Sequence, residues 1–162
     1  MIRLHPRLQD ERALRQLADI WQRRRSLRIA PLLDDDSAAA VHAALLRSPY
    51  TLLAPKPGEF RFQFWSLSFT PEDDVDPVLA ELGRWLLSEG AALVGRITGQ
   101  ALVGDQDRKL LAVLYSRGCY LDPHNDADGR RRVAYVVGLT EGSWPAEAVS
   151  YTHLRAHETV RN

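Results

Sequence analysis

The first amphipathic stretch of the chain spans residues 10–25. Its apolar positions recur three or four residues apart among charged neighbours: Leu14, Leu17, Ala18 and Trp21. This spacing predicts a helix with one buried face. The stretch ends in three consecutive arginines, 23–25, which suit the negative end of a helix dipole. We interpret them as a solvated helix end in preference to a phosphate contact.

Two shorter elements are predicted next. Residues 26–33 contain the apolar residues Leu27, Ile29 and Leu32 and are predicted to form a short strand. Three aspartates and Ser37 follow at 34–37 and offer N-caps for a helix over 38–47. That helix is expected to stop before Pro49, because the residue before a proline disfavours helical geometry.

Large apolar residues nearly alternate over residues 60–69, which predicts a strand with one strongly buried face. A row of aromatic rings can also stack bases, but no basic residues are interleaved here, so we assign the rings to the core. Pro77 then suits the first position of the longest helix, which reaches Ile97. Gly90 either ends that helix or lies between two helical pieces.

The pattern changes from helical to extended after Lys109. Residues 110–115 and 132–139 are rich in branched and aromatic side chains, and we predict a strand for each. A turn is expected at 116–118. The segment that joins the two strands contains the candidate chemistry.

Composition adds limits to this picture. A chain of 162 residues predicts one domain, and 45% apolar with 26% charged residues is typical of a soluble globular protein. Twenty-one basic and 21 acidic residues cancel, which disfavours a nucleic-acid partner. We find neither an apolar run of membrane-spanning length nor a signal peptide, so we expect a cytoplasmic protein without a membrane partner. Arginine supplies 19 of the 21 basic residues, which favours a GC-rich, bacterial source.

The last residues differ in character from the rest. Back-translation of residues 149–159 matches one frame of a transposase adapter used to prepare DNA for sequencing. We therefore expect 149–162 to be a non-native tail and exclude it from the fold, together with His153 and His157. The other 148 residues carry 19 basic and 20 acidic residues, a charge of −1, and three histidines.

A short metal-ligand pattern lies between the predicted strands. His124 and Asp126 are two residues apart, so in extended backbone both side chains project to one face. An imidazole and a carboxylate are two of the three ligands that hold non-haem iron(II). The pattern is weak alone: His124 can be an exposed loop residue, and Asp126 can belong to a turn with Asp128 and Gly129. Cys119 is assigned to packing.

The surrounding residues make the pattern more specific. They include Tyr115, Gly118, Leu121, His124 and Asp126, followed by Arg-Arg-Val-Ala-Tyr-Val-Val at 131–137, Leu139, Thr140 and Trp144. This arrangement resembles the iron(II)- and 2-oxoglutarate-dependent oxygenases of the prolyl-hydroxylase type, most clearly over residues 108–147. The resemblance implies that His124 and Asp126 bind iron. It also implies that the Tyr115 phenol donates a hydrogen bond to a carboxylate of the cosubstrate 2-oxoglutarate, with ascorbate as a candidate reductant.

The same resemblance implies an α+β fold, with N-terminal helices packed on a partial double-stranded β-helix, or jelly roll. Helices and first sheet strands would occupy residues 1–107, and the metal-ligand strands 108–147, in one domain over 1–148. The family also uses a distal histidine and a basic residue for the far carboxylate, and neither can be assigned here. We therefore expect a C-terminally truncated dioxygenase with little activity.

The substrate is expected to be a small molecule or a protein side chain, and neither it nor the oligomeric state follows from the sequence. An alternative interpretation keeps the jelly roll but removes the chemistry. In that case the chain is a binding or scaffold protein, and His124 and Asp126 only shape a turn.

Overall fold

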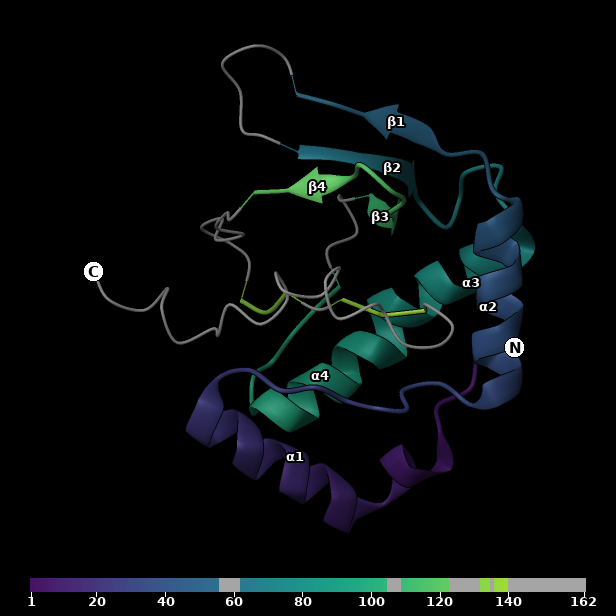
Figure 1. Ribbon diagram of the computed structural model, residues 1–162. Helices are drawn as coiled ribbons and strands as arrows, with labels where there is room; N and C mark the ends of the chain where they lie inside the picture. Colours follow the sequence, from purple (N-terminus) through teal and green to yellow (C-terminus); the bar gives the residue numbers. More distant parts are fainter. Residues whose placement is uncertain (56–61, 105–108, 123–131, 135, 140–162) are drawn as a thin grey trace.

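The computed structural model describes residues 1–55, 62–104, 109–122, 132–134 and 136–139, which form a mixed α+β structure (Figure 1). This confirms the predicted α+β class. In chain order the elements are η1 (Pro6–Gln9), α1 (Glu11–Arg24), α2 (Asp35–Arg47), β1 (Thr51–Leu53), β2 (Phe62–Phe69), α3 (Pro77–Trp85), η2 (Leu86–Gly90), α4 (Ala91–Thr98), β3 (Leu110–Leu114) and β4 (Tyr120–Leu121). Within the described part of the chain, no helix combines the length and apolar character needed to cross a membrane.

Helix α1 forms where the apolar spacing predicts it. The Asp10 carboxylate caps its first turn by accepting a hydrogen bond from the Arg12 amide at 3.0 Å. The helix packs on α4 through a small apolar cluster of buried residues: Leu8, Leu14, Leu17, Leu93 and Ile97. It ends at Arg25, whose backbone is left-handed with φ 54°.

Residues 26–33 do not form the predicted strand. Leu33 makes an isolated antiparallel bridge with Leu4, and the adjacent backbone adds a hydrogen bond from the His5 amide to the Leu32 carbonyl at 2.9 Å. The apolar side chains that suggested a strand, Leu27, Ile29 and Leu32, pack instead against the cluster between α1 and α4. These apolar side chains are therefore buried by contact with helices and not by strand pairing.

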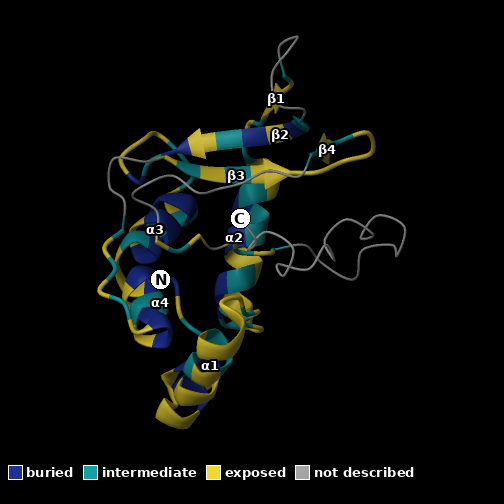
Figure 2. Ribbon diagram, turned by 90° about the vertical axis from the view of Figure 1, so that its left-hand side faces the viewer, coloured by how far each residue is buried: buried dark blue, intermediate teal, exposed yellow. Residues whose placement is uncertain are grey.

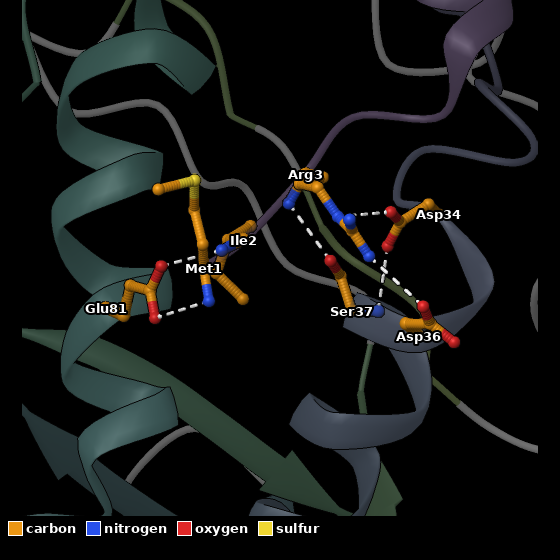
Figure 3. A network of polar contacts seen from close by, with 7 residues as sticks. All are labelled: Met1, Ile2, Arg3, Asp34, Asp36, Ser37 and Glu81. Carbon is orange, nitrogen blue, oxygen red and sulfur yellow. Dashed lines mark hydrogen bonds and ion pairs between the residues drawn. The ribbon is translucent and has the colours of Figure 1, made fainter.

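Helix α2 begins at the aspartate cluster, as predicted. The Asp34 carboxylate accepts a hydrogen bond from the Ser37 amide at 2.8 Å and pairs with the Arg3 guanidinium at 2.7 Å (Figure 3). Hydrogen bonds from Ser37, reinforced by the Arg3 charge, hold the pKa of Asp34 below its ordinary value. Nearby, the Ile2 amide donates to Glu81 of α3 at 2.7 Å, so the first residues of the chain link two helices.

The long predicted helix is a continuous helical run made of α3, η2 and α4. Pro77 occupies its first turn, and the Asp76 carboxylate accepts a hydrogen bond from the Val78 amide at 3.0 Å. Gly90 does not end the run: the π-helical turn η2 leads directly into α4.

The chain that leaves α4 crosses η2 at very short range. A Cβ atom on Gly104 would lie 2.3 Å from the Leu87 carbonyl oxygen and 2.7 Å from its Cα. Both neighbouring atoms are backbone, so neither can turn aside. Glycine at this position is what lets the two segments approach.

The sheet is antiparallel and has β2 at its centre, with β1 on one edge and β3 on the other (Figures 1 and 2). Trp65 of β2 pairs with Leu52 of β1 and with Leu114 of β3. The two strands predicted over 60–69 and 110–115 are therefore confirmed as β2 and β3. Strands β1 and β4 are not anticipated by the sequence pattern.

A four-residue bulge separates β3 from β4, which both pair with β2 from the same edge (Figures 1 and 2). Trp65 pairs with Leu114 and Gln63 pairs with Tyr120, so between these pairs one residue of β2, Phe64, faces the five residues 115–119 of the other segment. The four additional residues are 116–119. They contain the predicted turn, and Gly118 adopts a φ of 89° in it.

Helices α2 and α3 cover one face of the sheet and bury the larger apolar cluster (Figure 2). Its buried members are Ile2, Leu33, Val41, Ala44, Phe69, Leu79, Leu82, Trp85 and Leu86. From the sheet, Leu67, Leu110 and Ala112 also pack against it.

The segment 132–139 was predicted to be a strand, but its described residues are not in a strand. Val137 and Leu139 pack against the larger cluster, whereas Val136 is 95% exposed. The side chains thus alternate as in a strand, but this segment uses them to cover the core and pairs with no other strand in the described part. The strands that are described belong to one sheet.

Candidate functional site

The two predicted iron ligands, His124 and Asp126, lie outside the described residues. So do the adapter-like residues 149–162 and their two histidines. Tyr115, Cys119 and the strand pair that precedes His124 are described. The site is therefore built from β2, β3 and β4.

Tyr115 directly follows β3 and lies beside Phe64 of the central strand. The two ring centroids are 5.8 Å apart with a tilt of 50°. Phe64 in turn lies 5.4 Å from the ring of Phe62, so three aromatic rings follow one another across the sheet. Tyr115 keeps 37% of its surface exposed.

Strand geometry assigns these rings to the side of the sheet that α2 and α3 do not cover. Phe69 is buried among the helices and Leu67 packs there too, and side chains alternate along a strand. Phe62 and Phe64 therefore point the other way, with the β3 residues Leu111 and Val113 and with Tyr115 at its end. We call these five residues the outer face. Phe64 is 8% exposed, yet it belongs to neither apolar cluster.

The outer face continues past the bulge to Leu121 of β4. Leu121 of β4 pairs with Phe62, and so it lies on the same side of the sheet as Tyr115. His124 and Asp126 come three and five residues after Leu121 in the sequence. Tyr115 and Leu121 are thus on one face of the sheet.

The bulge holds a second polar feature, which the sequence reasoning missed. The Cys119 amide donates to the Ser116 carbonyl at 3.0 Å, and the Ser116 hydroxyl lies 3.5 Å from the Cys119 sulfur. Burial raises the pKa of the Cys119 thiol, but hydrogen bonds from Ser116 and the backbone of Trp65 outweigh it and leave the pKa lowered. The signal was the serine three residues before the cysteine, across a glycine turn.

A cleft of about 400 Å³ opens on the other side of the sheet, between the end of α2 and the start of α3. Arg47 and Asp76 line it and form an ion pair at 2.9 Å. Hydrogen bonds from the Val78 amide and from Arg47 lower the pKa of Asp76. Leu67, which also lines the cleft, points towards the helices, so this cleft is separate from the Tyr115 site.

The described residues hold no group of three or more histidine, cysteine, aspartate or glutamate side chains that could bind a metal. A complete metal centre is therefore not formed by the described part alone. The donor set that the sequence predicts, one imidazole and one carboxylate, fits two positions of an iron(II) facial triad.

Comparison with known proteins returned no matching family model, no matching curated protein and no matching solved structure.

Proposed function

We propose that this chain supplies the support helices and first metal strand of an iron(II)- and 2-oxoglutarate-dependent dioxygenase. One observation supports the proposal: Tyr115 lies on the outer face beside Phe64, and Leu121 of β4, three residues before His124 in the sequence, lies on the same face. A cosubstrate ligand and a metal-ligand pair need to meet on one surface, so the proposal requires His124 and Asp126 to reach the Tyr115 side of the sheet.

The apolar pattern of β3 supports a second sheet over the outer face. Leu110 and Ala112 pack towards the helices, while Leu111 and Val113 point away from them. A strand that is apolar on both sides is typical of a position between two layers. We therefore propose the jelly roll, in which a further sheet lies opposite β2 and β3.

Each assigned residue has one task in this proposal. His124 and Asp126 hold iron(II), and the Tyr115 phenol donates a hydrogen bond to a carboxylate of 2-oxoglutarate. With dioxygen as the oxidant, the bound metal and cosubstrate would couple decarboxylation of 2-oxoglutarate to succinate with hydroxylation of a substrate carbon. Phe64 packs on the Tyr115 ring and restricts its orientation.

The substrate in this proposal is a small molecule or a protein side chain, the reductant is ascorbate, and the compartment is the cytoplasm. A non-catalytic jelly-roll scaffold is the second candidate, in which Tyr115 only packs on Phe64 as part of the outer face. The two differ in whether His124 and Asp126 bind metal.

Metal titration of the 162-residue chain separates them. We expect His124→Ala and Asp126→Ala each to weaken Fe(II) binding under anaerobic conditions by about 10–100-fold, the range seen when support for a metal is removed. His42→Ala on α2 is the matched control and should bind as the parent chain does. Equal affinity in all four proteins would reject the dioxygenase in favour of the scaffold.

Tyr115→Phe tests the cosubstrate contact separately. Loss of a hydrogen bond to a charged carboxylate costs about 1.5–3 kcal/mol, or roughly 10–150-fold in affinity. We expect that loss for 2-oxoglutarate measured by calorimetry in the presence of Mn(II), with metal affinity unchanged. A variant that binds 2-oxoglutarate as tightly as the parent would remove Tyr115 from the site.

A further inference from the structure

Four arginines lie close together at the C-terminal end of α1. Arg23, Arg24, Arg25 and Arg28 are all exposed, and none forms an ion pair with a described residue. Elsewhere in the described part, Arg3, Arg47 and Arg96 each have a carboxylate partner. The positive charge at this end of the helix is therefore uncompensated. Figure 2 shows α1 at the edge of the molecule, far from the sheet.

The charge continues along the helix. Between Arg12 and Leu33 the sequence contains six arginines and one acidic residue, Asp19. At 100° per residue, Arg12, Arg15 and Arg23 project from one side of α1, opposite the buried Leu14 and Leu17. With a rise of 1.5 Å per residue, this row extends over about 16 Å. We call the row and the four terminal arginines the basic stripe.

Arg25 has an unfavourable backbone conformation for its residue type. Its φ of 54° and ψ of 9° are left-handed, and its amide donates to the Trp21 carbonyl at 2.8 Å. This helix-ending position favours glycine, because a side chain there crowds the backbone. Strain of this kind concentrates where the side chain has a function.

The surroundings of the basic stripe limit the kind of partner. Among the described residues from 2 to 45, no large apolar side chain is exposed. A helix that lies on a membrane inserts apolar side chains, and a protein interface centres on buried aromatic or apolar anchors. Binding of phosphate groups requires no exposed apolar side chain. Guanidinium groups bind phosphate in bidentate geometry.

We propose that the basic stripe binds the phosphate backbone of a nucleic acid without reading its sequence. The overall charge of zero argued against such a partner, but that charge is unevenly distributed: the stripe is basic, while acidic residues gather at 34–36 and 72–76. Binding of this type is governed by the local array of cations and by counterion release.

A salt titration with a short fluorescent DNA duplex and a single-stranded RNA tests the proposal by anisotropy. Each neutralised phosphate contributes about −0.9 to the slope of log affinity against log salt for duplex DNA. Arg24→Gln with Arg28→Gln should reduce that slope by about two and weaken binding at low salt by at least tenfold. Lys109→Gln with Arg117→Gln removes the same charge from exposed positions near the sheet and should leave both quantities unchanged.

Arg25→Gly separates function from folding. Glycine relieves the left-handed strain, so the thermal midpoint should rise while DNA affinity falls. Equal losses in the two double variants would show non-specific attraction to total charge and would overturn the proposal. It would also be overturned by absent DNA and RNA binding together with tight binding to phosphatidylserine vesicles.

Discussion

One side of the sheet packs on α2 and α3, whereas the other side keeps large apolar side chains at the surface. Beside α2 and α3 the contrast is clear, because Phe69 is 4% exposed while Leu111 and Val113 of the outer face are 54% and 37% exposed. It is reversed towards the other end of β2, where Trp65 on the helix side is 37% exposed and Phe64 on the outer face 8%. The residue types on the two sides are similar, so hydrophobicity alone does not decide which side is buried. The outer face, which includes Tyr115, is the side that no helix covers.

The largest difference between the two sides should appear when a leucine is shortened. Leu79 of α3 is fully buried against the sheet, and Leu79→Ala is expected to destabilise the fold by about 2–5 kcal/mol because it leaves a cavity. Leu111→Ala on the outer face should change the unfolding free energy by about 0.5 kcal/mol or less. Urea denaturation measures both, and similar losses would mean that the outer face is also part of the stable core.

A second contrast is between two glycines, one beside a neighbouring backbone segment and one in open space. Gly104→Ala places a Cβ against backbone atoms of Leu87, so one of the two segments must move at a cost of about 1–3 kcal/mol. Gly138 has no atom within 4 Å of an added Cβ, and Gly138→Ala should stay within about 0.5 kcal/mol of the parent. Thermal unfolding of the two variants gives the comparison. A harmless Gly104→Ala would contradict the close crossing at η2.

The elements that the sequence predicted correctly are those with local signals. Asp34 caps a helix where a cap was expected, and Pro77 begins the long helix. Strands β1 and β4 are three and two residues long and exist through their pairing with β2, a partner that no local pattern reveals. The prediction of a strand over 26–33 was wrong for a related reason. The apolar residues of that segment pack against helices, and no strand pairs with it.

The sequence identified Tyr115 as a candidate site residue, but it did not show which side of the sheet this residue faces. Apolar residues occupy both sides of β3, so the sequence could not say which side Tyr115 faces. The register with β2 decides it, because Leu111 and Val113 share the Tyr115 side and Ala112 packs on the helices. The sequence predicts the turn at 116–118, but it does not reveal that the segments before and after this turn pair with the same strand, β2.

The helix side also contains ionic contacts that depend on pH. The pKa of Asp34 is lowered by hydrogen bonds from Ser37 and by Arg3, and that of Glu81 mainly by the Ile2 amide. A carboxylate with a lowered folded pKa stabilises the fold above its unfolded pKa of about 4, and this contribution is lost as the pH falls through the folded value. The thermal midpoint should therefore fall between about pH 5 and pH 3.

Substitution identifies the group responsible. Asp34→Asn should lower the midpoint at neutral pH and flatten its decline in acid. Asp19→Asn on α1 is the control, because Asp19 is exposed and forms no ion pair with a described residue. An unchanged acid profile in Asp34→Asn would assign the dependence to other carboxylates.

The smallest expected change in unfolding free energy is that of replacing a valine by threonine on the outer face. The two side chains have nearly the same shape, so the exchange tests whether a hydroxyl at that position meets water. Val113→Thr should change the unfolding free energy by about 0.5 kcal/mol or less, because 37% of Val113 is exposed. Val41→Thr places the same hydroxyl in the cluster under the sheet, where no surface is exposed, and should cost about 1–3 kcal/mol. If both variants lost stability equally, the outer face would be as dry as the core, and the sheet would already be covered on both sides.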